Sequence, residues 1–399
     1  MLWRGKRGFV KRKDCNKKKI KVEIEYMRIG IDARIFGNSS FGGIARSVYN
    51  IISYWMKDYS MHEYYLIGFN KTVFDEEKIP ANWHIVIKEA VINTGAVWYR
   101  TVLPKIIKEL NINVYWGTSY TLPPKIKGVK MVLTIYDLAI LHFKGIGVRR
   151  TEIGLKLFGK SNCLKADQIV AISNATKKDI MDLWKIDSNK ITVSYCGGPQ
   201  RIEANELSAK EGNNVSDKIS NPYFLFVGTF EPRKNIPTII RAFERYCETN
   251  KCEMDLVLCG KRGWRCDDIY EMIEKSKFSK NIKVFGYIND IEKEYLIENA
   301  KIFLYPSLYE GFGIPILEAM QYNIPVITSN ISSMPEVGGD AAFYINSATD
   351  FIELENKMEQ VMKLTDIEKE QLKEKMAKQI CKFSWQKNAE EMIKIITSL

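Results

Sequence analysis

The chain has 399 residues, of which 46% are hydrophobic and 27% charged, and neither glycine nor proline is enriched. These values are typical of globular proteins and exclude low-complexity and collagen-like chains, and the length favours two domains over one. No apolar run reaches the roughly 18 residues that a membrane-spanning helix needs. The net charge of +11 divides into +7 for residues 1–26, +9 for 27–200 and −5 for 201–399, so we expect the two halves to meet different partners.

The basic first half suits an anionic acceptor or anionic lipid head groups, although a solvated surface is the plainer alternative. No nucleic-acid-binding motif accompanies the charge, so nucleic acid is not an expected partner. The eight cysteines form no C-x-x-C pair and only three histidines are present. This pattern argues against a zinc site and for reduced thiols in a cytoplasm.

The first predicted domain begins after a lysine-rich stretch, residues 1–26, that we interpret as a basic flexible extension. Short β-branched or aromatic runs then alternate with helical patterns, which is typical of βαβ units and a parallel sheet. This pattern over residues 27–198 therefore predicts a Rossmann-like domain. Its expected strands are Arg28–Ile31, Tyr64–Phe69, Val114–Trp116, Met131–Tyr136, Gln168–Ile172 and Ile191–Ser194, and its expected helices are Ile44–Met56, 149–166 and 174–184.

A polar stretch, residues 199–221, predicts a linker, after which the pattern restarts as a second Rossmann-like domain over 222–380. Ligands of such sheets bind at the carboxyl ends of the strands, so the loops that follow the strands are the candidate sites. The expected strands are Tyr223–Val227, Leu256–Cys259, Val284–Phe285, Ile302–Tyr305 and Val326–Thr328, and the expected helices are 237–247, 267–277, 290–299, 315–321, 351–364, 366–380 and 385–398.

The loop Gly228-Thr-Phe-Glu-Pro-Arg-Lys-Asn235 joins the first of these strands to a helix. Backbone donors and the helix dipole favour anions at a helix start. Arg233 could hold a phosphate with two hydrogen bonds and Lys234 could add a point charge. The alternative is a solvent-facing basic pair.

A second loop, Glu310-Gly-Phe-Gly-Ile-Pro-Ile-Leu-Glu318, follows the strand Ile302–Tyr305. Gly311 and Gly313 allow a close backbone approach. Glu310 could accept hydrogen bonds from sugar hydroxyls, and Glu318, expected in the first turn of the next helix, could accept two from a ribose. The alternatives are an exposed loop acid and an acid that favours a helix start.

A third loop, Phe41-Gly-Gly-Ile-Ala-Arg46, could form the opposite wall of a phosphate site through Gly42 and Gly43. A Gly-Gly turn alone is weak evidence. The loop lacks the third glycine and the downstream acid of a dinucleotide fingerprint, which argues against the alternative of a nicotinamide-dependent oxidoreductase.

These motifs, with Pro325-Val-Ile-Thr-Ser and Pro335-Glu-Val-Gly-Gly-Asp-Ala-Ala, resemble glycosyltransferase family 4 from about Met27 to the C-terminus. The resemblance implies the GT-B fold, an α/β architecture in which two Rossmann-like domains have parallel sheets facing a central cleft. The N-terminal domain would bind the acceptor and the C-terminal domain the nucleotide-sugar. The last segment, 381–399, is expected to form a helix that packs back toward the N-terminal domain.

Carried over by residue, the resemblance implies that Arg233 and Lys234 hold the donor pyrophosphate, in the loop that Gly228 opens. Glu318 would hold the ribose and Glu310 the transferred sugar. Gly311, Phe312 and Gly313 would lie along the sugar and phosphate, and Gly42 and Gly43 would close over the phosphates. Arg233, Lys234 and Glu310 are the expected catalytic residues.

One position departs from the family. Many relatives have His-Asp-Leu where this chain has Tyr136-Asp137-Leu138. We expect Tyr136 and Asp137 to contact the sugar or the acceptor, although a tyrosine cannot become a cation at neutral pH. Asp267 and Asp268 are interpreted as acids that start a helix and not as metal ligands.

The resemblance predicts a retaining transferase that needs neither a metal nor a cofactor. It would move a hexose, mannose from GDP-mannose or rhamnose, to an oligosaccharide or lipid-linked saccharide in surface polysaccharide or lipopolysaccharide synthesis. We expect a cytoplasmic protein that is peripheral at the inner face of the membrane. The alternative is a non-catalytic GT-B subunit that scaffolds or regulates an active partner.

Overall fold

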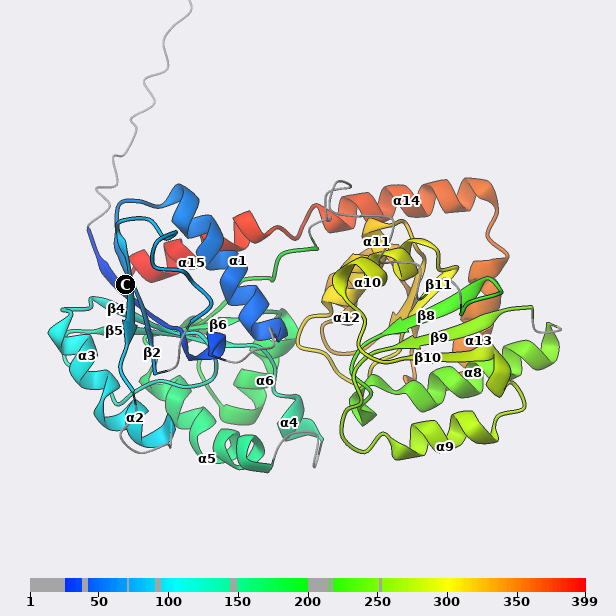
Figure 1. The fold of residues 1–399 in the computed structure, drawn as a ribbon, viewed down its shortest axis with the longest axis horizontal. Helices are drawn as coiled ribbons and strands as arrows, with labels where there is room; N and C mark the ends of the chain where they lie inside the picture. The colour runs from blue at the N-terminus through cyan, green and yellow to red at the C-terminus, as the bar shows by residue number, and fades with distance from the viewer. Residues whose placement is uncertain are drawn as a thin grey trace, which may run out of the picture.

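The computed structural model describes residues 26–37, 42–69, 72–89, 95–143, 149–199, 215, 218–250 and 253–399. The predicted extension, except for Tyr26, and most of the predicted linker 199–221 lie outside these residues. Two α/β domains lie side by side along the long axis of the molecule (Figure 1). Across the described ranges, no helix has both the length and the apolar character to span a membrane.

The first domain contains a seven-stranded parallel sheet in the order β3-β2-β1-β4-β5-β6-β7. Six of its strands lie where the apolar runs predicted them. The seventh, β3, was not predicted because Trp83–Ile87 is a partly exposed edge strand with a histidine in it. The strands are β1 Arg28–Asp32, β2 Glu63–Gly68, β3 Trp83–Ile87, β4 Val114–Gly117, β5 Lys130–Ile135, β6 Gln168–Ala171 and β7 Ile191–Val193.

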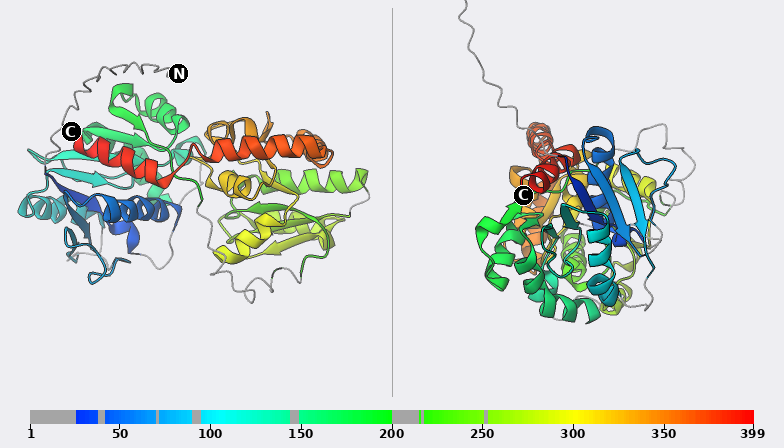
Figure 2. Two further views of the ribbon diagram at one scale, coloured as in Figure 1. Left: turned by 90° about the horizontal axis from the view of Figure 1, so that it is seen from above. Right: turned by 90° about the vertical axis from the view of Figure 1, so that its left-hand side faces the viewer.

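Helices cover both faces of this sheet (Figures 1 and 2). Tyr64 and Leu66 point into a core shared with α1 and α15, whereas Tyr65 and Ile67 point into a core shared with α2, α3, α5 and α6. Residues 95–109 form two of these helices. The helices are α1 Gly43–Asp58, α2 Gly95–Thr101, α3 Leu103–Glu109, α4 Ala139–His142, α5 Arg149–Lys165, α6 Asn174–Trp184 and α15 Trp385–Thr397.

The second domain repeats the plan with a six-stranded parallel sheet in the order β10-β9-β8-β11-β12-β13. Helices α8, α9 and α13 lie on one side of it and α10, α11, α12 and α14 on the other (Figure 1). The elements are β8 Tyr223–Val227, α8 Ile236–Thr249, β9 Asp255–Cys259, α9 Asp267–Lys275, β10 Ile282–Phe285, α10 Asp290–Glu298, β11 Ile302–Tyr305, α11 Ile314–Gln321, β12 Val326–Ser329, α12 Met334–Gly338, β13 Phe343–Ile345, α13 Phe351–Met362 and α14 Asp366–Ile380.

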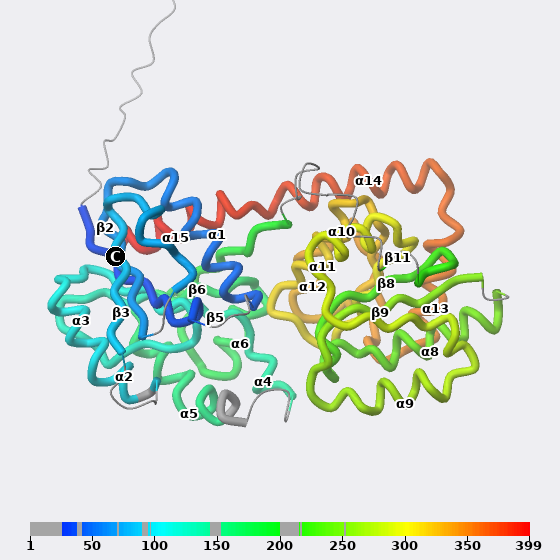
Figure 3. Tube along the Cα trace, viewed as in Figure 1, coloured from blue at the N-terminus to red at the C-terminus, as the bar shows by residue number. Residues whose placement is uncertain are grey.

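After α14 the chain crosses back to the first domain, where α15 packs along α1 (Figure 3). The indole N–H of Trp55 donates to the carbonyl of Ala389 at 2.9 Å, and the Asn388 amide donates to Ser194 Oγ at 2.8 Å. A Cβ at Gly197 would lie 2.3 Å from the Trp385 ring. The two segments that connect the domains therefore contact each other. The C-terminal helix is therefore part of the core of the N-terminal domain.

The expectation of reduced thiols does not hold for Cys247, which is disulfide-bonded. The described free cysteines are Cys163, Cys196, Cys259, Cys266 and Cys381. Burial raises the pKa of the Cys163 and Cys196 thiols to about 12, so these two remain protonated, unreactive core residues.

Candidate active site

The central site lies where the strand order of the second sheet reverses. Strands β8 and β11 are neighbours there, although β9 and β10 lie between them in sequence. Connections from the two strands leave in opposite directions, which opens a crevice at their carboxyl ends. The loops 228–235 and 306–313 both start at this point and are therefore forced together.

Backbone and side-chain hydrogen bonds join the two loops. The N–H of Leu308 donates to the Arg233 carbonyl at 2.8 Å, and the Asn235 amide donates to the Pro306 carbonyl at 3.0 Å. Asn235 itself has a left-handed backbone, with φ of 57°, at the junction between a short 3-10 turn, Pro232–Lys234, and helix α8. The arrangement fixes the two cations at the start of this helix.

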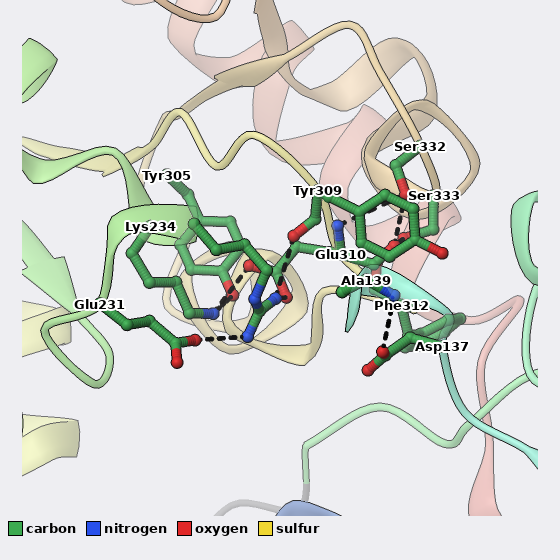
Figure 4. Close-up of polar contacts among 12 residues, drawn as sticks. Asp137, Ala139, Glu231, Lys234, Tyr305, Tyr309, Glu310, Phe312, Ser332 and Ser333 are labelled. Carbon is green, nitrogen blue, oxygen red and sulfur yellow. Dashed lines mark hydrogen bonds and ion pairs between the residues drawn. The ribbon is translucent and has the colours of Figure 1, made fainter. Parts of the chain in front are cut away.

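Arg233 and Lys234 both donate to Glu310, which Figure 4 shows beside Lys234 and Tyr305. Arg233 Nη1 lies 2.5 Å from Glu310 Oε2, and Lys234 Nζ lies 2.7 Å from Oε1. The second guanidinium branch, Nη2, contacts Glu231 Oε1 at 2.6 Å, and Lys234 also donates to the Tyr305 hydroxyl at 2.7 Å. The cluster thus pairs two cations with two carboxylates.

The charge state of Glu310 follows from this cluster. Burial alone disfavours its ionised form, but Lys234 and Arg233 outweigh burial and lower the pKa of Glu310 to about 2. Glu310 is therefore a carboxylate at neutral pH and a pure hydrogen-bond acceptor. The cations are not the solvent-facing pair that was one alternative, and any bound diphosphate would have to share Arg233 with Glu310 and Glu231.

The glycine loop after Glu310 lies against the N-terminal domain. A Cβ at Gly311 would lie 2.3 Å from the Tyr136 carbonyl oxygen and 2.8 Å from Asp137 Cβ, so only glycine fits there. Gly313 has φ of 116° and forms the N-cap of α11, a conformation that favours glycine. Phe312 between them is buried against Tyr195 and Phe383, with ring centroids 6.0 and 5.4 Å apart.

Glu318 does not lie in the first helical turn as predicted, because α11 begins at Ile314 and its first turn holds no acid. Stabilisation of a helix start therefore does not explain this residue. Its carboxylate is held by Lys293 Nζ at 2.8 Å, away from the Arg233 cluster. Lys293 also faces Asp290, which pairs across the domains with Arg46 of α1 at 3.2 Å. These four side chains line a pocket of about 360 Å³ between the domains.

Tyr136 is the main predicted site residue that the structure does not bring to the cleft. Its side chain is buried and lines a small internal cavity with Trp116, Cys196 and Asn388, and burial keeps its pKa well above the ordinary value. Only its carbonyl faces Gly311. Asp137 accepts from the Ala139 N–H at 3.0 Å, and burial raises its pKa although the nearby Arg233 opposes the shift.

The remaining predicted glycines occupy different surroundings. Gly42 and Gly43 lie at the start of α1 and are exposed, and a Cβ added at either position would meet no other atom within 4 Å. Gly228 lies beside Lys234, whose Cε would be 3.7 Å from a Cβ there. The structure therefore unites Gly228 with the cluster and leaves Gly42 and Gly43 open to solvent.

Three side chains of the site were missed by sequence reasoning. Glu231 stands two residues before Arg233 in the same motif, and Tyr305 ends the strand that leads to Glu310. The sequence motifs therefore pointed to both positions. No motif pointed to Lys293, because it lies on another helix and meets Glu318 only through the fold.

At a second contact between the domains, Glu336 of α12 caps α6 of the first domain. Its carboxylate accepts from the N–H groups of Asn174 and Ala175 at 2.8 and 2.7 Å and from the Tyr195 hydroxyl at 3.0 Å. Nearby, Asp179 contacts both Tyr309 at 2.5 Å and His142 at 3.0 Å. These groups border a second pocket of about 570 Å³ between the domains.

In the described ranges, no group of three or more His, Cys, Asp or Glu side chains is placed to hold a metal ion. Asp267 and Asp268 form the first turn of α9, as expected of acids that start a helix. Asp267 pairs there with Arg262 at 2.6 Å.

Comparisons with known proteins identify relatives by sequence and by fold. Relatives by sequence include the O-antigen chain mannosyltransferase B of Escherichia coli, 30% identical over 61% of this chain and 65% of that protein. The O-antigen chain mannosyltransferase RfbU of Salmonella typhimurium is 25% identical over 63% and 66%, and a serotype-specific mannosyltransferase WbdA of Escherichia coli is 30% identical over 59% and 29%. The matches thus span less than two thirds of each relative's length.

Solved structures with the same fold include a glycosyltransferase from Rickettsia africae, with a TM-score of 0.70, 19% identity and coverage of 94% and 98% of the two chains. WaaG, a glycosyltransferase involved in lipopolysaccharide biosynthesis, gives a TM-score of 0.64, 16% identity and coverage of 93% and 100%. The family model of Glycosyltransferase Family 4 matches residues 41–197, and that of Glycosyl transferases group 1 matches residues 209–396. The chain therefore belongs to the two-domain glycosyltransferases of the GT-B fold, with a family 4 domain followed by a group 1 domain.

Proposed function

We propose that the protein is a retaining hexosyltransferase that moves mannose from GDP-mannose to a saccharide acceptor in O-antigen or related surface polysaccharide synthesis. The observation that carries the proposal is the cluster of Arg233, Lys234 and Glu310 at the β8/β11 crevice. The sugar identity is supported by the names of the relatives, which are mannosyltransferases. Rhamnose is the second candidate for the transferred sugar.

In the proposed mechanism the donor diphosphate lies against Arg233 and Lys234, and the sugar lies against Glu310. The acceptor hydroxyl attacks the anomeric carbon from the face that the diphosphate leaves, and passes its proton to the departing phosphate oxygen. The C–O bond to phosphate breaks as the new glycosidic bond forms, with retention of configuration. Preorganised cations beside a developing negative charge are a large source of rate enhancement.

The cation pair supplies this charge stabilisation without a metal, so we propose metal-independent transfer. Glu310 would have two roles, because it holds both cations in place and accepts hydrogen bonds from the sugar. Glu318, held by Lys293, would bind the ribose. We further propose that the acceptor is an oligosaccharide or a lipid-linked saccharide and that the protein works peripherally at the cytoplasmic face of the membrane.

A donor panel tests the proposal. The full chain is incubated with GDP-mannose, dTDP-rhamnose, UDP-glucose and UDP-galactose, with and without a chelator, while thermal shift and nucleoside-diphosphate release are measured. We expect GDP-mannose alone to raise the melting temperature and to be slowly hydrolysed in the presence of the chelator. Binding without hydrolysis or transfer would favour the non-catalytic scaffold, and loss of turnover in chelator would contradict metal independence.

A further inference from the structure

Helix α5 exposes apolar side chains on the face that a helix in water normally keeps polar. Ile153, Leu157 and Leu164 are 49%, 65% and 59% exposed. Their spacing of four and seven residues places them on one stripe. Phe158 beside this stripe is 47% exposed.

The helix cannot rotate to bury the stripe, because its inner face is already packed. A Cβ at Gly159 would lie 2.4 Å from the Trp184 ring, so α5 and α6 approach as closely as glycine allows. Asn162 and Cys163 are buried on the same inner side, where the Asn162 amide donates to the Tyr120 carbonyl at 3.1 Å. The exposure of the apolar stripe is thus a consequence of how the domain is packed.

The described charged side chains on this face are lysines. Between Ile153 and Lys165 the helix carries three lysines and no acid, and Lys156 and Lys160 are exposed within the apolar stripe. Arg100 of α2 adds a further cation, since its guanidinium carbon lies 5.4 Å from the centroid of the Phe158 ring. We define the α5 face by its exposed residues, Ile153, Lys156, Leu157, Phe158, Lys160 and Leu164.

We propose that the α5 face docks on the surface of an anionic lipid bilayer. Apolar side chains would enter the interface, while the lysine stems lie along it with their ammonium groups among the phosphates. A second copy of the chain is a poorer occupant, because it would bring Lys156 and Lys160 of two molecules together. One amphipathic face supports reversible binding only.

Docking here would bring the cleft close to the lipid surface. Helix α4 follows Tyr136 and Asp137 directly and precedes α5 in the chain, and both helices lie along the same edge of the molecule (Figure 1). A saccharide carried by a lipid would be presented at this edge. The inference rests on the proposed function only for that acceptor, because lipid binding itself needs no sugar substrate.

Vesicle co-sedimentation of the full chain tests the proposal, with phosphatidylethanolamine vesicles that contain roughly one-third phosphatidylglycerol and, in parallel, pure phosphatidylcholine vesicles. We expect binding to the anionic vesicles only. Because each lysine near an anionic surface contributes about fivefold, Lys156→Gln with Lys160→Gln should weaken partitioning by roughly 30-fold. Ile153→Ser, Leu157→Ser and Leu164→Ser together should weaken it on the order of tenfold or more.

The matched control replaces exposed apolar residues elsewhere. Ile352→Ser with Ile367→Ser, at positions 44% and 73% exposed on α13 and α14, should leave vesicle binding unchanged. All variants should keep the wild-type melting temperature and the wild-type hydrolysis of a free donor, since the changed side chains lie outside the proposed site.

Three outcomes would overturn the proposal. One is equal binding to anionic and neutral vesicles, another is unchanged binding in both sets of α5 variants, and the third is a concentration-dependent dimer that only the α5 variants abolish. Binding that follows the α5 face in a protein that hydrolyses no sugar nucleotide would leave the proposal intact and contradict the proposed function instead.

Discussion

The two walls of the cleft are built differently. On the C-terminal wall, Arg233, Lys234 and Glu310 are interlocked by ion pairs within two short loops. On the N-terminal wall, Gly42 and Gly43 are exposed at the start of α1, Tyr136 is turned into the core, and Asp137 faces the cluster. A preorganised wall suits a donor whose diphosphate is constant. A wall with few fixed side chains suits an acceptor that differs between related enzymes.

The largest expected effect comes from the cation cluster. Arg233→Ala, Lys234→Ala and Glu310→Gln should each lower turnover of the donor on the order of 10²–10³-fold. The first two remove a cation beside the leaving group, and the third removes the carboxylate that holds both cations in place. Steady-state nucleoside-diphosphate release measures this, with circular dichroism to confirm folding. Arg241→Ala, an exposed arginine of α8, is the control and should stay near wild type. Comparable rates in all three cluster variants would mean that the C-terminal wall is not catalytic.

The contact between the walls gives the next largest effect. Gly311→Ala places a methyl group 2.3 Å from the Tyr136 carbonyl, so the two domains must separate to accommodate it. We expect turnover to fall roughly 10- to 100-fold through misplacement of the reacting groups, together with a lower melting temperature. The control is Gly154→Ala on α5, where a Cβ has no neighbour within 4 Å. If both variants behave alike, the close approach of the walls is dispensable.

The sequence predicts the structural elements behind the first of these two predictions, but not the contact behind the second. The strands β8 and β11 were predicted with their correct bounds, because buried parallel strands give unbroken apolar runs. The contact of Gly311 with Tyr136 could not be predicted, since it depends on how the domains meet. The side chain of Tyr136 points into the core of the N-terminal domain although its motif position is next to the cleft, and the motif alone does not determine this orientation.

Glu318 and Lys293 should affect affinity more than rate. Glu318→Gln removes the carboxylate that would bind the ribose, and Lys293→Met removes its partner at 2.8 Å. Each should raise the KM for the donor roughly tenfold, as expected for loss of a charged hydrogen bond, while kcat changes little. A fall in kcat at constant KM would instead assign this pair to the chemical step.

The smallest effect at neutral pH is expected from Asp137. Burial raises its pKa, so in the folded protein Asp137 takes up a proton at a higher pH than an ordinary aspartate, whereas Glu310, with a pKa of about 2, stays ionised throughout. Wild-type turnover should therefore fall as the pH drops through the raised pKa of Asp137. Asp137→Asn should lower kcat only several-fold and flatten this acid limb. An acid limb that persists in Asp137→Asn would show that another group titrates.

Binding of GDP, the expected product, tests the central claim that the interlocked residues of the C-terminal wall hold the donor diphosphate. Titration calorimetry would compare the wild type with Arg233→Ala on one wall and Asp137→Asn on the other. The account predicts that Arg233→Ala weakens GDP binding at least tenfold, as expected for a lost charge-assisted contact, and that Asp137→Asn leaves it within about twofold of wild type. Unchanged affinity in Arg233→Ala, or an equal loss in both variants, would contradict it.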